Sequence, residues 1–264
     1  MRADPGSATG VERIADAFAS HGRRAALMPY LMGGFPDVDA SREVGLACAD
    51  AGADLLELGI PFSDPLADGP VIHAAGTAAL QAGVTPMWVL EVCAALSERV
   101  PVVLMAYANL LLGHAGFVEK AATAGAAGLI VPDLPHDEAG PLREEADSLG
   151  IALVPLAAPT TTDARMAEIG RDARGFVYTV SLTGTTGERH ELPPELGRTV
   201  ERVRATTDVP VAVGFGISTP EQARAVGDVA DGVIVGSRLV RAAGEGGADE
   251  VGELVRGLAG ALAT

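Results

Sequence analysis

Short apolar runs rich in valine, isoleucine and leucine recur along the chain and alternate with segments of helical spacing. The segments 41–52 and 220–230 are examples of the helical kind, with many alanine, glutamate and arginine residues. Near-continuous apolar strands separated by helices are typical of a parallel sheet that helices cover. The apolar runs are 26–33, 54–61, 101–108, 128–133, 152–159, 176–182, 209–216 and 232–237.

Eight such strand and helix units in 264 residues predict an α/β fold, a closed (β/α)8 TIM barrel. We expect a single domain, residues 1–264, with the barrel at about 25–262. The segment 11–21 predicts an extra N-terminal helix that covers the bottom of the barrel. The glycine-rich stretch 244–250 predicts a loop before the last helix. A doubly wound open sheet is the alternative arrangement.

The acidic balance of the chain narrows the ligands that it can bind. The formal net charge is −16, and no basic patch is apparent, so we expect no nucleic-acid partner. A phosphate group would have to be held locally, by backbone N–H groups and helix N-termini. The chain has no apolar run of about 20 residues and no signal-peptide pattern, so we expect a cytoplasmic protein with no membrane partner.

A carboxylate in an apolar run is the first candidate for chemistry, which in such a barrel lies at the C-terminal ends of the strands. Glu57 shares a face of its predicted strand with Leu55 and Gly59, and Asp68 follows in the next loop. Burial of a carboxylate raises its pKa, as a general acid–base requires near neutral pH. The alternative is a structural carboxylate. Other polar residues at predicted strand ends are Asp64, Tyr107, Asn109, Asp133 and Tyr178.

Two glycine-containing stretches end the last two predicted strands. They read GFGIS at 214–218 and GS at 236–237, and the second opens a helix-like segment. Barrels often bind phosphate at this place, through loop N–H groups and a helix N-terminus, and glycines let the backbone approach the phosphate closely. The alternative is that these are ordinary turn glycines.

Other chemistries lack the residues that they need. The one lysine, Lys120, lies in a helical segment and not at a strand end, so an imine-forming enzyme is not expected. The five histidines show no metal-ligand spacing, so we expect no metal ion and no cofactor. Cys48 and Cys93 lie in separate helical segments, and we expect buried thiols. Of the reaction classes considered, proton transfer by carboxylates on a phosphorylated substrate remains.

Several motifs, in this order and spacing, resemble one family over about residues 25–260. They are LELGIPFSDPLADGP, LMAYAN, GLIVPDLP, LAAPTT, VGFGIST and GVIVGS, and the family is the tryptophan synthase alpha subunit. The resemblance implies a lyase that cleaves indole-3-glycerol phosphate to indole and glyceraldehyde 3-phosphate in tryptophan biosynthesis. It implies that Glu57 shuttles the proton and that Asp68 accepts the indole N–H. It also implies a set of substrate-binding residues, namely Tyr30, Met105, Tyr107, Tyr178, Thr186, Gly187, Gly216, Gly236 and Ser237.

The resemblance also implies a partner, the beta subunit, in an alpha2beta2 heterotetramer, with pyridoxal phosphate on the partner and no cofactor on this chain. A stand-alone indole-releasing lyase, or a paralogue of specialised metabolism, is the alternative within the family. A sugar-phosphate or aminoimidazole isomerase would need acid and base residues at strands 1 and 5. Those strands end here in Met32–Gly33 and Ala157–Ala158. A non-catalytic barrel would have lost one of the two carboxylates, Glu57 or Asp68.

Overall fold

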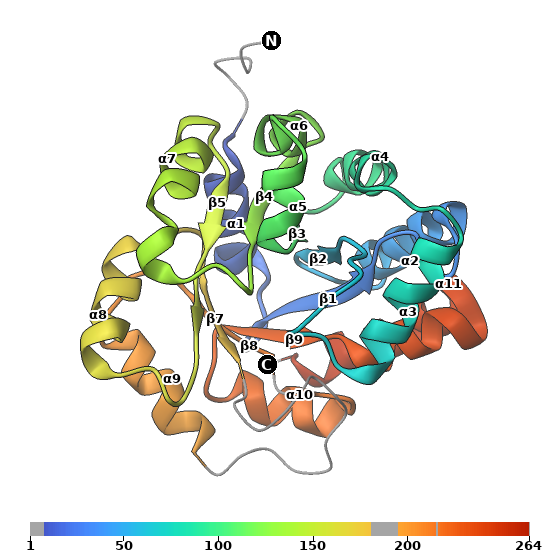
Figure 1. The fold of residues 1–264 in the computed structure, drawn as a ribbon. Coiled ribbons are helices and arrows are strands. Elements are labelled where there is room, and N and C mark those ends of the chain that lie inside the picture. The colour runs from blue at the N-terminus through green and yellow to red at the C-terminus, as the bar shows by residue number, and fades with distance from the viewer. Residues whose placement is uncertain (1–7, 181–194, 215, 264) are drawn as a thin grey trace.

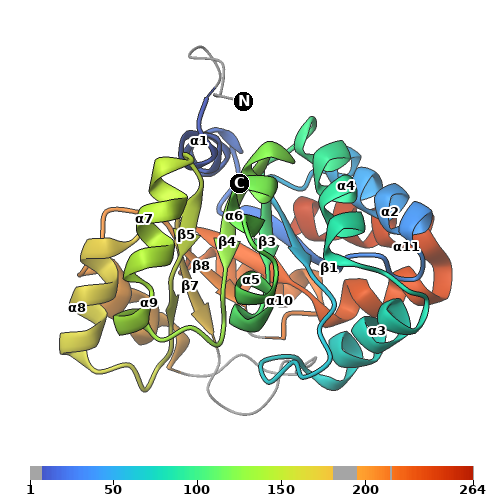
Figure 2. The ribbon, with the colours of Figure 1, turned by 45° about the horizontal axis from the view of Figure 1, so that its top comes forward.

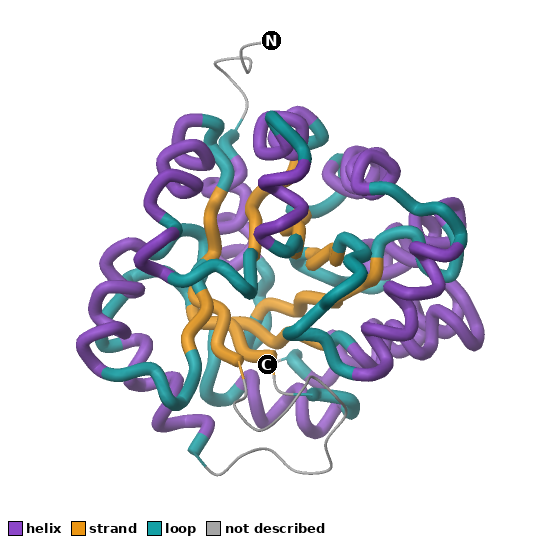
Figure 3. The backbone as a smooth tube through the Cα atoms, viewed as in Figure 1, coloured by secondary structure: helices purple, strands orange, loops and turns teal. Residues whose placement is uncertain are grey.

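The computed structural model describes residues 8–180, 195–214 and 216–263. Within these ranges the chain forms one parallel sheet of nine strands, in the order β5-β4-β3-β2-β1-β9-β8-β7-β6, with helices outside it (Figures 1 and 3). The strands are β1 (Ala26–Met32), β2 (Leu56–Gly59), β3 (Val102–Met105), β4 (Ala126–Ile130), β5 (Ala152–Val154), β6 (Leu156–Ala157), β7 (Val177–Val180), β8 (Val211–Gly214) and β9 (Gly232–Val235).

The predicted TIM barrel is confirmed, with one strand broken in two. The run expected at 152–159 is interrupted at Pro155, so that β5 pairs with β4 and β6 pairs with β7. Proline has no N–H to donate to a neighbouring strand, which is why a strand divides there. The Pro155 carbonyl still accepts the Tyr178 N–H at 3.0 Å, and the continuous chain joins the two edges of the sheet. The open-sheet alternative is therefore wrong.

Helices follow the strands around the outside of the barrel. In the described part of the chain they are α1 (Gly10–Ser20), α2 (Val38–Asp50), α3 (Pro70–Gln81), α4 (Pro86–Ser97), α5 (Ala108–Gly113), α6 (Phe117–Thr123), the 3-10 turn η1 (His136–Glu138), α7 (Gly140–Ser148), α8 (Asp163–Asp172), α9 (Leu196–Arg204), α10 (Pro220–Gly227) and α11 (Ser237–Ala261). The loop expected at 244–250 is reduced to a break at one residue. Gly247, with φ 63° and ψ −148°, is not helical and divides α11 into two helical parts, and its positive φ suits glycine.

The extra helix α1 closes the bottom of the barrel, as predicted. Ile14 and Phe18 on its buried face pack into the barrel interior, where the Phe18 and Phe176 ring centroids lie 5.6 Å apart. A capping box between Thr9 and Glu12 fixes where the helix begins. Figure 2 shows α1 at the end of the barrel opposite the loop between β2 and α3. Helix α1 therefore does not cover that loop end.

Side chains alternate between two cores along each strand. In β2, Leu56 and Leu58 pack outward against the helices, whereas Leu55, directly before the strand, packs into the barrel interior. Glu57 lies between the two outward leucines and therefore points inward, as the sequence predicted.

No single helix within the described ranges is long and apolar enough to cross a membrane; the bent pair α3 and α4 meets the criteria by length and composition alone. Ile72, Val89 and Leu96 of this pair are buried in the protein core, whereas Leu80, Met87 and Trp88 are exposed.

Candidate active site

Glu57 is a carboxyl group enclosed by the barrel. Its side chain is 1% exposed, and it lies on β2 beside Tyr30 of β1, its register partner. Its Oε2 atom is buried and has no hydrogen-bond partner among the described residues. Burial, and secondarily the nearby negative charge of Asp68, raises the pKa of Glu57 to about 8. Glu57 is therefore mostly protonated at pH 7 and has a free oxygen with which to meet a substrate.

Asp68 is the second carboxyl group, on the loop between β2 and α3. Its N–H donates to the Pro65 carbonyl at 3.2 Å, which forms a tight turn. Burial raises its pKa to about 6, and a hydrogen bond from Tyr107 and the charge of His73 oppose that rise. Asp68 is therefore mostly ionised at pH 7, where Glu57 is mostly neutral. Two neighbouring carboxyl groups in opposite charge states are the arrangement that acid–base catalysis on two different atoms needs.

Tyr107 joins the β2–α3 loop to the end of β3. Its hydroxyl donates to Asp68 Oδ1 at 3.0 Å and accepts the Ala67 N–H at 3.0 Å. Its ring stacks on Phe62, with centroids 5.1 Å apart and an interplanar angle of 22°. Burial and the charge of Asp68 raise the pKa of Tyr107, so its hydroxyl keeps its proton and remains a donor.

Tyr30 and Tyr178 complete the ring of groups around the two carboxyls. Burial raises the pKa of each tyrosine well above its usual value, and the charges of both Asp68 and Glu57 add to the shift. The structure therefore places both hydroxyls within the electrostatic reach of both carboxyls. Met105, at the end of β3, packs against the interior core and against the cluster around Tyr30.

Two glycines, each on the strand next to that of its tyrosine, make room for these side chains. A Cβ atom on Gly59 would overlap the Tyr30 hydroxyl, and one on Gly214 would lie 2.6 Å from the Tyr178 hydroxyl. Sequence reasoning missed this function of Gly59 and Gly214, and it also missed Phe62. The only available signal was that Gly59 shares a strand face with Glu57.

The expected phosphate-binding residues lie at the ends of β8 and β9. Gly216 has a positive φ of 69°, and Gly236 directly precedes α11. Ser237 is the first residue of that long helix and is 6% exposed. A Cβ on Gly236 would lie 3.5 Å from Tyr30 Cβ, so this helix start borders Tyr30 of the carboxyl site. Helix N-termini attract anions through their unpaired N–H groups and the helix dipole.

Some predicted site residues lie apart from this group. Thr186 and Gly187 lie outside the described residues. Asp64 and Asn109 are exposed, and Asp133 accepts the Ala108 N–H at 2.8 Å at the start of α5, which is a structural role. The remaining predicted residues lie around the carboxyl pair or at the nearby start of α11, except Gly216, which lies after β8.

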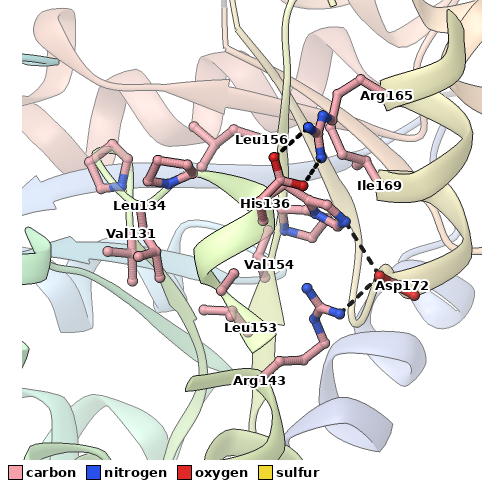
Figure 4. A pocket seen from close by; sticks show the side chains of 15 residues that line it. Val131, Leu134, His136, Arg143, Leu153, Val154, Leu156, Arg165, Ile169 and Asp172 are labelled. Atoms are coloured by element: carbon pink, nitrogen blue, oxygen red, sulfur yellow. Dashed lines mark hydrogen bonds and ion pairs between the residues drawn. The ribbon is translucent and has the colours of Figure 1, made fainter. Parts of the chain in front are cut away.

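A cavity lies outside this group of residues, beside the strand break at Pro155. Figure 4 shows this cavity of about 320 Å³ between the barrel wall, α7 and α8. Its charged side chains pair with one another. Arg165 binds both oxygens of Asp137, at 2.5 and 2.6 Å, whereas Arg143 and His136 share the Asp172 carboxylate. These ion pairs connect α7 and η1 to α8.

The described residues include no group of three or more histidine, cysteine, aspartate or glutamate side chains that could hold a metal ion. Cys48 and Cys93 are free and buried, as predicted, and burial raises the pKa of each thiol to about 12. Neither thiol is therefore a ready nucleophile.

Comparison with known proteins shows which family this chain resembles. The sequence model of the family described as tryptophan synthase alpha chain matches residues 17–259. The tryptophan synthase alpha chain of Synechococcus sp. (strain CC9902) is 52% identical over 223 residues, which cover 83% of each chain. That of Synechococcus elongatus (strain ATCC 33912 / PCC 7942 / FACHB-805) is 48% identical over 94% of this chain and 96% of the relative.

Solved structures show the same likeness in three dimensions. A chain of Mycobacterium tuberculosis tryptophan synthase superimposes with a TM-score of 0.91 at 38% identity, covering 98% of this chain and all of that one. Tryptophan synthase subunit alpha from Legionella pneumophila str. Paris gives a TM-score of 0.86 at 33% identity, covering 97% of this chain and 99% of that one. The family model matches most of the chain, and relatives are about half identical along most of its length. The chain therefore belongs to the tryptophan synthase alpha chain family, whose members are lyases.

Proposed function

We propose that this chain cleaves indole-3-glycerol phosphate by a retro-aldol step to indole and glyceraldehyde 3-phosphate, in tryptophan biosynthesis in the cytoplasm. The observation that carries the proposal is the buried pair of carboxyls, in which Glu57 has a pKa of about 8 and Asp68 a pKa of about 6. Between those values one group donates a proton while the other carries negative charge. The reaction needs both at once.

Glu57 is the proton shuttle in this proposal. Its carboxyl proton goes to C3 of the indole ring, which leaves a positive charge spread toward the ring nitrogen. The bond between C3 and the side chain then breaks, and its electron pair restores the aromatic ring. The side-chain hydroxyl becomes the aldehyde and returns its proton to the Glu57 carboxylate. The free, buried Oε2 supports this role because an enclosed acid transfers its proton without competition from bulk water.

Asp68 stabilises the charge that forms in that first step. As an anion it accepts the indole N–H, and the attraction grows as the nitrogen becomes positive. Its place on a loop held by Tyr107 gives it a fixed orientation before the substrate arrives. Preorganised charge of this kind lowers the barrier more than a mobile side chain would, because little reorganisation remains at the moment of reaction.

The substrate has an aromatic end and an anionic end, and the surrounding residues suit both. In this proposal Tyr30, Met105, Tyr107 and Tyr178 contact the indole ring. The phosphate binds to the N–H groups around Gly216, Gly236 and Ser237, as the start of a long helix favours. Thr186 and Gly187 complete the site in the proposal, on the strength of the motif alone. No metal or organic cofactor takes part in the proposed steps.

The proposed partner is a tryptophan synthase beta subunit, in an alpha2beta2 heterotetramer. Two apolar side chains are unusually exposed at the mouth of the barrel: Leu66, which is 77% exposed, and Leu112, which is 85% exposed. Leu66 lies on the β2–α3 loop, which follows β2, and Leu112 lies on α5, the helix that follows β3. Exposed apolar residues at one end of a molecule suit a protein interface. An interface here would communicate with the loop that carries Asp68.

Indole release from indole-3-glycerol phosphate by the purified chain, with and without a beta subunit, tests the proposal. Slow release that the partner accelerates strongly would support the proposed function and partner together. Fast release that is indifferent to the partner would support the stand-alone alternative. Absence of release in both conditions would contradict the proposed reaction.

Leu112→Asp tests the partner surface separately. We expect release by the isolated chain to stay within about twofold, because an exposed substitution rarely changes stability by more than about 0.5 kcal/mol. Acceleration by the beta subunit should fall about tenfold or more, because the charge would have to be desolvated in the interface. Titration of the partner in the indole assay measures both quantities. Leu80→Asp on α3, a 37% exposed residue at the far end of that helix, is the control and should keep the acceleration.

A further inference from the structure

Tyr107 makes contacts that a simple wall of an indole pocket does not need. Its hydroxyl bonds to the Asp68 carboxylate and to the Ala67 N–H, each at 3.0 Å, and its ring stacks on Phe62. One side chain at the end of β3 therefore holds the β2–α3 loop at three positions. Both bonds occupy the hydroxyl. It donates its one proton to Asp68, and one of its oxygen lone pairs accepts the Ala67 N–H.

We propose that Tyr107 is the positioning residue of Asp68, which it holds as an oriented anion for the indole N–H. This inference rests on the proposed function and adds a residue that acts through Asp68. The phenol O–H stabilises the carboxylate form specifically, because it donates a hydrogen bond to a charged acceptor. The Ala67 N–H, which donates to the same phenol oxygen, orients that O–H toward Asp68.

The surroundings of Asp68 leave Tyr107 as its only described direct hydrogen-bond donor from a side chain. His73 of α3 acts on Asp68 through its charge, and Glu57 of β2 is mostly protonated at neutral pH. Tyr30 of β1 and Tyr178 of β7 face the same space as neutral phenols, since burial raises their pKa. Loss of the Tyr107 hydroxyl should therefore raise the pKa of Asp68.

Tyr107→Phe tests the inference, because it keeps the ring and the Phe62 stacking and removes only the hydroxyl. We expect the acidic limb of the kcat/KM profile, near pH 6 in the unaltered chain, to move up by about one pH unit, as loss of a charged hydrogen bond implies. At pH 6.5 that shift lowers the ionised fraction of Asp68 about threefold, so kcat should fall about threefold, with KM little changed. Ser148→Ala on α7 is the control: it removes an exposed hydroxyl that donates to the Glu145 carbonyl, away from the carboxyl site, and its acidic limb should stay in place.

Two further measurements separate positioning from a structural role. In an Asp68→Asn background, Tyr107→Phe should have little further effect on kcat, because its route to the reaction is already gone. Equal effects of Tyr107→Phe in both backgrounds would overturn the inference. Thermal unfolding of each variant shows whether the fold is kept.

A titration of Asp68 in ¹³C-aspartate-labelled chain, followed by NMR, needs no activity at all. A raised Asp68 pKa in Tyr107→Phe, with indole release in the unaltered chain, supports the inference. The same shift in a chain that releases no indole would refute the proposed function and keep the link between the two residues. An unmoved Asp68 titration would overturn the inference whatever the activity.

Discussion

Replacing Glu57 with glutamine is expected to abolish indole release while the barrel still folds. Glutamine has nearly the same shape as the protonated glutamic acid that the pKa of about 8 implies at neutral pH. The glutamine amide has no acidic proton to give to indole C3. It also has no carboxylate that could receive a proton from the substrate hydroxyl. General acid–base steps contribute about 10²- to 10⁴-fold, and here one group serves both steps. We therefore expect a loss of at least about 10³-fold in kcat, measured with purified chain and saturating beta subunit.

The pH dependence of stability provides a second readout of Glu57. Because its pKa is raised in the folded chain, the native state binds more protons than the unfolded state between about pH 4.5 and pH 8. This group therefore makes the free energy of unfolding fall as pH rises through that window, by up to about 1.4 kcal/mol per pH unit. Glu57→Gln should remove that slope, as urea unfolding at several pH values would show.

A matched control variant tests whether the effects of Glu57→Gln depend on the position of Glu57 in the barrel interior. Glu253 on α11 is exposed, and Glu253→Gln makes the same chemical change away from the barrel interior. It should leave both kcat and the pH slope of stability unchanged. Near-normal turnover in Glu57→Gln would end the proton-shuttle assignment. Loss of folding in Glu57→Gln would instead mean that the carboxyl is structural.

Replacing Asp68 with asparagine is expected to reduce kcat by about 10²-fold or more and to spare phosphate binding. The amide keeps an oxygen that can accept from Tyr107, so the loop keeps its anchor. It carries no negative charge to oppose the positive charge that forms on the indole nitrogen. Loss of one preorganised electrostatic contact at a reacting group costs about 10²- to 10³-fold. Steady-state kinetics, together with the Kd of glycerol 3-phosphate measured by calorimetry, would check both parts.

Asp68→Asn should also change the pH profile in two ways. The acidic limb near pH 6 should disappear, because the group that titrates there is gone. The pKa of Glu57 should fall, because the charge of Asp68 is one of the causes of its rise, so the alkaline limb should move to lower pH. If glycerol 3-phosphate binding is lost with the activity, or the chain unfolds, Asp68 has a structural role.

The sequence by itself predicted the barrel and the location of its candidate chemistry. Alternation along the run that contains Glu57 set the inward direction of that side chain, and the same run placed Gly59 on its face. These are local properties, since strand geometry fixes which side chains share a face. The motif order likewise indicated the family, which the relatives confirm.

Only the tertiary structure decided how these groups act on one another. The break at Pro155, the room that Gly59 leaves for Tyr30, and the bond from Tyr107 to Asp68 all join segments distant in sequence. The difference between the pKa values of Glu57 and Asp68 also depends on the tertiary structure. Burial, charge and hydrogen bonding depend on distance in space, and for Asp68 they come from β2, α3 and the end of β3 together. The order of residues along the chain determines which side chains share a face of a strand. The distances between groups on different strands, helices and loops are determined by packing.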